Sequence, residues 1–302
     1  MADDKKRIDQ PTGTETVGHE WDGIEELNTP LPRWWLWTLY ATIVWAIAYT
    51  IAYPAWPMIS NATAGMLNWS SRGQLEEQLA ADQAKRAPIM RAIAATPVEQ
   101  LEGRPELMEA AVEGGRAAFR QNCVACHGSG AAGSKGYPNL NDDDWLWGGD
   151  IKTIHYTIEH GVRNPGHDRT RMSQMPAFGR DGLLQPAEID GLAAYVRTIS
   201  RQRPADESAK RGSALFQTNC TACHGTNASG NREFGAPNLT DAIWLYGGDE
   251  ESVRKSINDA RFGVMPRWGE KLDPATVKML AAYVHSLGGG ERQTVQIAKK
   301  QK

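Results

Sequence analysis

Two short stretches decide how this chain of 302 residues is built: Cys123-Val-Ala-Cys-His127 and Cys220-Thr-Ala-Cys-His224. They contain all four cysteines of the sequence. In a Cys-x-x-Cys-His pattern, the two thiols reach the two vinyl groups of one porphyrin, and the histidine that follows lies beneath the iron. Each stretch therefore predicts a covalently bound haem c, attached through Cys123 and Cys126 or through Cys220 and Cys223, with His127 or His224 as an axial ligand.

Two other kinds of site also use closely spaced cysteines. A structural zinc site needs cysteine pairs that come together, and it gives no reason for a histidine directly after each pair. A redox-active dithiol needs a single motif next to a βαβ unit. Because the whole pattern occurs twice with matched surroundings, haem attachment is favoured over both.

The surroundings of the two motifs form an internal repeat. Gly115-Arg-Ala-Ala-Phe119 precedes the first motif, and Gly212-Ser-Ala-Leu-Phe216 precedes the second. The first copy is longer in a later stretch that holds His155, His160 and His167, which we expect to face solvent. Four further matches follow in the same order: Pro138-Asn-Leu140 with Pro237-Asn-Leu239, Trp145-Leu-Trp-Gly-Gly-Asp150 with Trp244-Leu-Tyr-Gly-Gly-Asp249, Met175-Pro176 with Met265-Pro266, and Ala193-Ala-Tyr-Val196 with Ala281-Ala-Tyr-Val284.

Each copy is predicted to be a small helical domain. One helix leads into each Cys motif, with glycine and phenylalanine four residues apart on one face. A last helix closes each copy, from Pro186 to Ser200 and from Pro274 to Leu287, with proline in the first turn, where its missing N–H costs nothing. Loops rich in glycine, proline and asparagine lie between them.

This pattern resembles the class I cytochrome c fold. In that family the first and last helices cross beside the haem at a glycine and an aromatic residue. The resemblance implies that this contact is made within each copy: by Gly115, Phe119 and Tyr195 in the first, and by Gly212, Phe216 and Tyr283 in the second.

The same resemblance points to a methionine followed by proline as the second axial ligand, and Met175 and Met265 hold the matching positions. A thioether opposite histidine raises the reduction potential and fills the iron, which suits electron transfer. Met172 is an alternative to Met175, and His160 or His167 could instead complete a bis-histidine site. Either methionine could also be gap-filling core. The sequence leaves open whether each methionine serves the haem of its own copy.

The segment Trp34–Tyr53 contains no charged residue, and its 20 residues would span about 30 Å as a helix. Tryptophan and tyrosine lie at both ends of it, as in the aromatic belts of membrane-spanning helices. A cleaved signal peptide is the alternative, but the run is long for one and a polar tail precedes it. We expect a retained anchor. Covalent haem attachment outside the bacterial cytoplasm then places the N-terminus in the cytoplasm and the haem domains in the periplasm.

Composition excludes other classes of protein. Lysine and arginine number 33 against 36 aspartate and glutamate, which gives a net charge of −3, so nothing indicates a nucleic-acid partner. The mean hydropathy of −0.50 excludes a protein with many membrane spans.

The predicted fold class is mainly α, with one N-terminal transmembrane helix and two tandem class I cytochrome c domains. The expected parts are a cytoplasmic tail (1–33), a transmembrane helix (34–55), a periplasmic helical linker (56–107), cytochrome c domain 1 (108–202), cytochrome c domain 2 (203–290) and a C-terminal tail (291–302).

The segment before the anchor carries the most specific resemblance. Gly18-His-Glu-Trp21 and the residues that follow as far as Trp35 are similar to the N-terminus of the dihaem subunit of cbb3-type cytochrome c oxidases, the subunit III or FixP/CcoP type, and the likeness covers essentially the whole chain. It implies an electron-transfer subunit that is not itself the catalyst, with two haem c groups in His/Met ligation. Its partners would be a periplasmic donor cytochrome c and the monohaem and catalytic subunits of a proton-pumping oxidase in the bacterial inner membrane.

Two other functions share the haem motifs. One is an independent membrane-anchored dihaem shuttle or the cytochrome subunit of a periplasmic dehydrogenase, neither of which explains the Gly18–Trp35 tail. The other is a dihaem peroxidase, which needs one haem with an open or displaceable ligand site.

Overall fold

The computed structural model describes residues 6–292, which form two compact units, one ending at Ala84 and one beginning at Lys85. Residues 1–5 of the expected cytoplasmic tail and 293–302 of the expected C-terminal tail lie outside the described residues. The elements before residue 96 are β1 (Thr16–Trp21), β2 (Ile24–Leu27), α1 (Arg33–Ala52) and α2 (Ser71–Ala95). Those after it are η1 (Val98–Gln100), α3 (Pro105–Asn122), α4 (Val124–His127), α5 (Ile151–His160), α6 (Pro186–Ile199), α7 (Glu207–Asn219), α8 (Thr221–His224), α9 (Glu250–Asp259) and α10 (Pro274–His285).

The N-terminal segment forms an antiparallel hairpin of β1 and β2, which the sequence reasoning did not predict. Asp22 and Gly23 make the turn, both with positive φ, so the backbone twist of the turn matches that of the strands. Trp21 and Ile24 face each other across the last pair and are about 70% exposed, at 69% and 71%. The hairpin therefore presents apolar side chains on its surface.

Helix α1 is 20 residues long, with a mean hydropathy of 1.4 in its most apolar window, and none of that window is buried in the protein. By length and composition it can cross a membrane. Its hydroxyl groups bond to carbonyl oxygens of the preceding turn, as Thr38 does to Trp34 (3.0 Å) and Thr50 to Ile47 (2.9 Å). The threonine hydroxyls are thus satisfied within the helix, as a lipid environment demands.

Helix α2 is capped by Ser70, whose hydroxyl accepts the N–H of Gly73 (3.0 Å). The helix continues through Pro88, which lies in its interior. Its end belongs to the second unit, because Ile93 is fully buried in the same core as Leu101.

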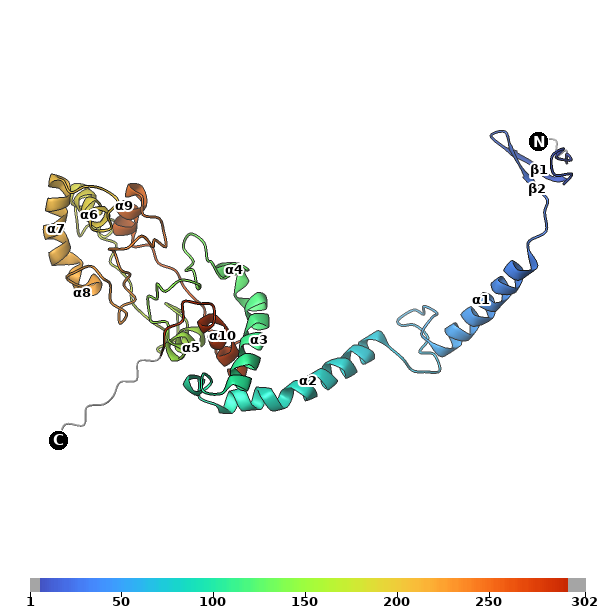
Figure 1. Ribbon diagram of the computed structural model, residues 1–302, viewed down its shortest axis with the longest axis horizontal. Coiled ribbons are helices and arrows are strands. Elements are labelled where there is room, and N and C mark those ends of the chain that lie inside the picture. The colour runs from blue at the N-terminus through green and yellow to red at the C-terminus, as the bar shows by residue number, and fades with distance from the viewer. Residues whose placement is uncertain (1–5, 293–302) are drawn as a thin grey trace. The chain divides into compact units, whose positions relative to one another are not determined.

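The second unit is built on an exchange of helices between the two copies of the repeat. Helix α3, from the first copy, packs against α10, the last helix of the second copy (Figure 1). Helix α7, from the second copy, packs against α6, the last helix of the first. The expectation that the first and last helices cross within each copy is therefore wrong.

Individual contacts show the exchange directly. The ring centroids of Phe119 and Tyr283 lie 5.3 Å apart, and those of Tyr195 and Phe216 also lie 5.3 Å apart. A Cβ added to Gly115 would overlap the backbone of α10 at Met279. The residues predicted for the crossing do make it, but with the partner from the other copy.

The helices between the motifs and the final helices also pack against the other copy. Helix α5 packs against α10, and α9 packs against α6. Two cores result. One contains Phe119, Ile154 and Leu280, and the other contains Leu192, Phe216 and Val253.

Candidate functional site

The two Cys-x-x-Cys-His motifs lie on the short helices α4 and α8, which continue directly from α3 and α7. The N–H of Cys123 donates to the carbonyl of Phe119 (2.8 Å), and that of Cys220 donates to the carbonyl of Phe216 (2.9 Å). A glycine with positive φ ends each short helix, at 77° for Gly128. Because α3 and α7 are fixed by their packing, they hold the thiols and histidines in place.

Each motif histidine is oriented by a backbone carbonyl. Nδ1 of His127 lies 3.2 Å from the carbonyl oxygen of Pro138, and Nδ1 of His224 lies 3.1 Å from that of Pro237. A carbonyl can only accept, so Nδ1 carries the proton and Nε2 is left with a lone pair for a metal. Burial lowers the pKa of both histidines, against a smaller opposing effect of the proline carbonyls, which favours the neutral, ligating form.

The sequence marks Pro138 and Pro237 only as equivalent positions of the repeat. It did not predict that their carbonyls bond to the motif histidines. The signal was present, because Pro-Asn-Leu follows both motifs at a similar distance. Its meaning depends on the fold, which brings a carbonyl and an imidazole together.

The first thiol of each motif is partly buried. Burial, helped by the second thiol of the motif, raises the pKa of Cys123 and of Cys220 to about 11. Redox-active or zinc-binding cysteines need the opposite shift. Within residues 6–292, no three side chains of His, Cys, Asp or Glu are grouped as a metal ion would require.

The candidate methionines lie in different cores. Met265 packs against the core that contains Phe119, together with Cys123. Met175 packs against the core that contains Phe216, together with Cys220. Met172, the alternative to Met175, has 72% of its surface exposed.

The three histidines of the longer first copy are not solvent-facing, so that expectation is wrong. His160 is only 4% exposed, and its Nδ1 lies 3.1 Å from Nε2 of His167. Arg267 donates to Nδ1 of His167 (2.7 Å), which fixes the direction of both hydrogen bonds. His155 is also largely covered. His160 and His167 turn inward, where they bond to each other and to Arg267, whereas His155 lies 3.6 Å from a carboxylate oxygen of Glu159.

The donor set suits haem c. Each motif supplies two unpaired cysteine thiols and a histidine with a free Nε2, beside a core of aliphatic and aromatic side chains that a candidate methionine, Met265 or Met175, packs against. Thioether bonds need the thiols, and axial ligation of low-spin iron needs the nitrogen and the sulfur. The residues therefore fit the group that the motif implies.

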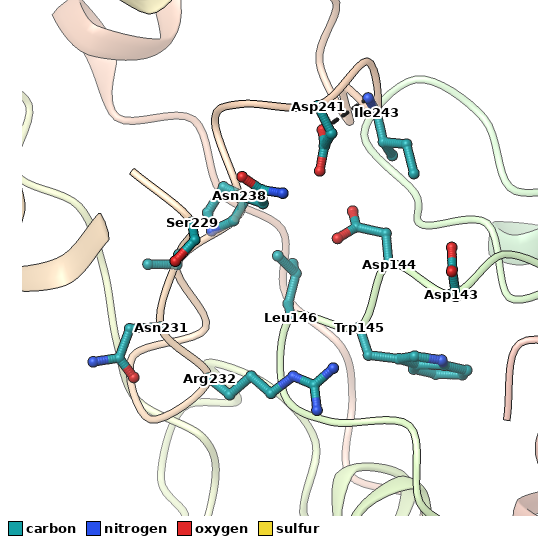
Figure 2. Close-up of a pocket in the computed structure, with 13 residues that line it drawn as sticks. Asp143, Asp144, Trp145, Leu146, Ser229, Asn231, Arg232, Asn238, Asp241 and Ile243 are labelled. Atoms are coloured by element: carbon teal, nitrogen blue, oxygen red, sulfur yellow. Dashed lines mark hydrogen bonds between the residues drawn. The ribbon is translucent and has the colours of Figure 1, made fainter. Parts of the chain in front are cut away.

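Residues of the two copies also line a half-open polar pocket of about 530 Å³, and neither motif is part of its lining. Figure 2 shows Asp144 from the first copy and Asp241 from the second at one side of this space, with Arg232 on the other. Burial and then the charges of Asp241, Asp142 and Asp143 raise the pKa of Asp144 to about 6, against the opposing effect of Arg232.

Reciprocal contacts join the copies beside this pocket. Gly136 packs on the ring of Tyr246, and Gly235 packs on that of Trp147. A side chain at either glycine would collide with, or crowd, the ring of the other copy.

Helical repeats with two haem-attachment motifs, joined to one apolar helix long enough to span a bilayer, define a membrane-anchored tandem cytochrome c. The family models agree. One described as "Cytochrome C oxidase, cbb3-type, subunit III" matches residues 110–196 and again 207–284. One described as "N-terminal domain of cytochrome oxidase-cbb3, FixP" matches residues 13–60.

Curated relatives give the same result over nearly the full length. The chain is 52% identical to a cbb3-type cytochrome c oxidase subunit FixP of Azorhizobium caulinodans, over 94% of this chain and 96% of that protein. It is 51% identical to subunit CcoP of Cereibacter sphaeroides, over 93% and 97%. The chain belongs to the FixP/CcoP family, subunit III of the cbb3-type cytochrome c oxidases. It is thus a haem c-binding component of a multi-subunit oxidase, anchored to a membrane.

Proposed function

We propose that this chain is the electron-input subunit of a proton-pumping cbb3-type oxidase. Electrons come from a donor cytochrome c in the periplasm and pass through two covalent haem c groups. They continue to the monohaem subunit and then to the catalytic subunit, where oxygen is reduced to water. The similarity to FixP and CcoP over nearly the whole chain supports this assignment.

Eight residues hold the two haems in this proposal. Four cysteines attach them, two histidines provide one axial ligand each, and two methionines provide the other. A haem bound in this way supplies reversible one-electron transfer at an iron with no vacant position. These residues are Cys123, Cys126, His127, Met175, Cys220, Cys223, His224 and Met265.

The chain's own residues keep each site suited to electron transfer. The carbonyls of Pro138 and Pro237 keep His127 and His224 in the tautomer that can ligate. Phe119 and Phe216 are almost fully buried and exclude water from the adjoining cores. Lower polarity favours the less charged, reduced state of the iron, which raises the potential.

The proposal separates this subunit from the oxygen-reducing site. Of the described helices, only α1 meets the length and hydropathy expected of a membrane span, and it contains no histidine. Haem b and copper within a membrane need several histidine ligands. Those ligands must therefore come from another subunit.

The proposed orientation follows from where haem c is attached. Covalent attachment takes place outside the bacterial cytoplasm, and both motifs follow α1 in the chain. The N-terminal hairpin then lies on the cytoplasmic side and the unit from Lys85 lies in the periplasm. The exposed Trp21 and Ile24 of the hairpin suit a contact with another subunit.

The observation that carries the proposal is the pair of motif histidines, each with Nδ1 bonded to a proline carbonyl, in a chain of this family. The test is to purify the tagged full-length chain from membranes in mild detergent. Haem b, copper and oxygen uptake driven by a reduced cytochrome c should purify with it. Recovery with a periplasmic dehydrogenase, or alone with both haems, would overturn the proposal.

A further inference from the structure

We propose that the loop between α1 and α2, residues 54–70, is a second membrane contact of this chain, lying among the lipid headgroups at the C-terminal end of α1. This loop, called the return loop below, touches the bilayer without spanning it. The contact requires only that α1 is anchored in a membrane. It is therefore independent of the direction of electron transfer and of which side of the membrane carries the haems.

The return loop is bound to the last turn of α1 (Figure 1). The N–H of Met66 donates to the carbonyl of Ile51 (2.9 Å), and that of Leu67 donates to the carbonyl of Ala52 (3.0 Å). Carbonyls in the last turn of a helix have no partner within the helix, so the returning chain satisfies them. Gly65 permits the close approach, because its φ is +72° and a Cβ there would lie 2.5 Å from the carbonyl oxygen of Ala52.

This attachment fixes the depth of the return loop. The 20 residues of α1 rise about 30 Å, which matches the hydrocarbon core of a bilayer. The two ends of α1 therefore reach the two interfaces, with Arg33 and Trp34 at the first of them. A loop bound to the last turn of α1 lies at the level of the headgroups at the other interface.

The surface of the return loop is apolar and carries no charge. No charged residue occurs between Arg33 and Arg72. Ile59 is fully exposed, in a turn closed by the N–H of Met58 and the carbonyl of Asn61 (2.6 Å). An apolar surface that is not buried by its own protein indicates a contact with lipid or with another protein. The large apolar side chains of the loop that are more than half exposed are Trp56, Met58, Ile59, Met66 and Leu67.

Polar groups of the return loop are paired within the chain. The hydroxyl of Thr63 accepts the N–H of Trp56 (3.1 Å), and the N–H of Thr63 donates to the carbonyl of Trp56 (2.9 Å). Nε1 of Trp69 donates to Oε1 of Gln74 (3.2 Å), while its ring meets that of Tyr53 edge-on at 5.7 Å between centroids. Paired backbone groups and amphipathic aromatic rings suit the boundary between water and lipid.

Continuity with α1 favours lipid over a protein partner as the occupant of this surface. The most apolar window of α1 is unburied, and the uncharged run continues from it through the whole return loop. Charged residues resume at Arg72, in the first turn of α2. The rim of a protein–protein interface is normally polar and includes charged groups, and the return loop has no charged group for one.

The test uses the oxidase complex purified through this subunit and placed in lipid nanodiscs. Ser60→Cys puts one free thiol next to Ile59, because haem attachment consumes the four natural cysteines. An NBD fluorophore on this thiol is exposed in turn to lipids with a nitroxide near the headgroup, to lipids with a nitroxide deep in the acyl chain, and to iodide in the water. Intensities are compared with and without each quencher, so energy transfer to haem cancels. The labelled complex without Ser60→Cys gives the background.

The shallow nitroxide should quench the fluorophore more than the deep nitroxide does, and iodide should quench it weakly. Adding Ile59→Asp should remove most of the nitroxide quenching and increase quenching by iodide, because a carboxylate resists transfer out of water. The matched control is Gln78→Asp, at an exposed position in α2, which should change neither. Because Ile59 is fully exposed, its replacement leaves the loop folded, and unchanged haem spectra check this.

Two results would overturn the proposal. Strong quenching by iodide without quenching by either nitroxide would show that the return loop lies in water. Protection from iodide and from both nitroxides would show that another subunit covers it. Both results leave the co-purification of haem b and copper unaffected, so failure of the lipid contact is distinct from failure of the proposed function.

Discussion

The contact of Gly114 with Met279 can be tested by moving the natural residues of one helix crossing into the other. Gly114→Arg introduces the residue that stands at the equivalent position of α7. Met279→Gly introduces the residue that stands at the equivalent position of α6. The double variant therefore carries at the α3–α10 crossing the residues that stand at the equivalent positions of α7 and α6, Arg211 and Gly191.

The structure gives the expected size of each effect. At Gly114 even a Cβ meets the Met279 side chain, with Cε 3.2 Å away, so a long side chain overpacks the crossing and should cost about 2 kcal/mol. Met279→Gly leaves a cavity and adds a glycine to a helix, which together should cost about 3–5 kcal/mol. In the double variant the arginine occupies space vacated by methionine. We expect a favourable coupling of at least about 1.5 kcal/mol.

The assay is urea unfolding of the detergent-solubilised chain, followed by the far-red methionine–iron band and by circular dichroism. All four members of the double-mutant cycle are compared. A matched control combines Met279→Gly with Gly103→Arg, at a position where the nearest atom to an added Cβ is 3.7 Å away, and its effects should add. If Gly114→Arg and Met279→Gly are also additive within about 0.5 kcal/mol, α3 and α10 do not pack as described.

Three further predictions concern other parts of the second unit. The folded state raises the pKa of Asp144 to about 6 from an ordinary value of about 3.9, so folding binds extra protons between these values and stability falls as pH rises through this window. Asp144→Asn should therefore raise the melting temperature at pH 8 but not at pH 4. Asp143→Asn, at an exposed position, should change the melting temperature little. A soluble fragment beginning at Lys85 should unfold at a higher temperature than one beginning at Glu106, because the shorter fragment lacks the fully buried Ile93 and Leu101. Burial of each of these side chains stabilises the folded state by about 1.5–3 kcal/mol. Equal melting temperatures of the two fragments would contradict this packing. Lys278→Met should destabilise the fragment beginning at Lys85 by about 1–3 kcal/mol, because it removes the Nζ that donates to the carbonyls of Ala94 (2.6 Å) and Thr96 (2.7 Å). Urea unfolding measures this loss, and an unchanged unfolding curve would show that these hydrogen bonds contribute nothing to stability.

The sequence was sufficient for features that depend on local chemistry. The final helices begin at Pro186 and Pro274 as predicted, because proline in the first turn needs no partner for its missing N–H. The helix over the apolar segment begins at Arg33 and ends at Ala52, close to the predicted run. The mainly helical fold class with two tandem cytochrome c domains is also confirmed.

The exchange of helices between the two copies cannot be predicted from the glycines and aromatic residues at the helix crossings. Gly115 and Gly212 are equivalent, and so are Tyr195 and Tyr283, so either pairing satisfies the same pattern. One position to the side, Gly114 faces Met279 of α10, where an added Cβ would overlap the Sδ atom. Without a reason to compare the copies for complementary size, the sequence remains ambiguous.

Two smaller helices were missed because their neighbourhood is rich in glycine and asparagine. Helices α5 and α9 begin after Asp150 and Asp249, whose side chains accept the N–H of Thr153 (3.0 Å) and of Ser252 (2.9 Å). An aspartate directly after Gly-Gly was therefore an available N-cap signal. The Asp22-Gly23 turn of the hairpin was a second local signal that was not used.

We expect both haems of this chain to carry electrons during oxygen reduction. The most direct measurement is rapid mixing of the donor-reduced oxidase complex with oxygen, while the haem c absorbance is followed by stopped flow. Both haems of this subunit should be reoxidised at least as fast as the complex turns over. Steady turnover while either haem stays reduced would contradict it, because electrons would then reach oxygen without passing through that haem.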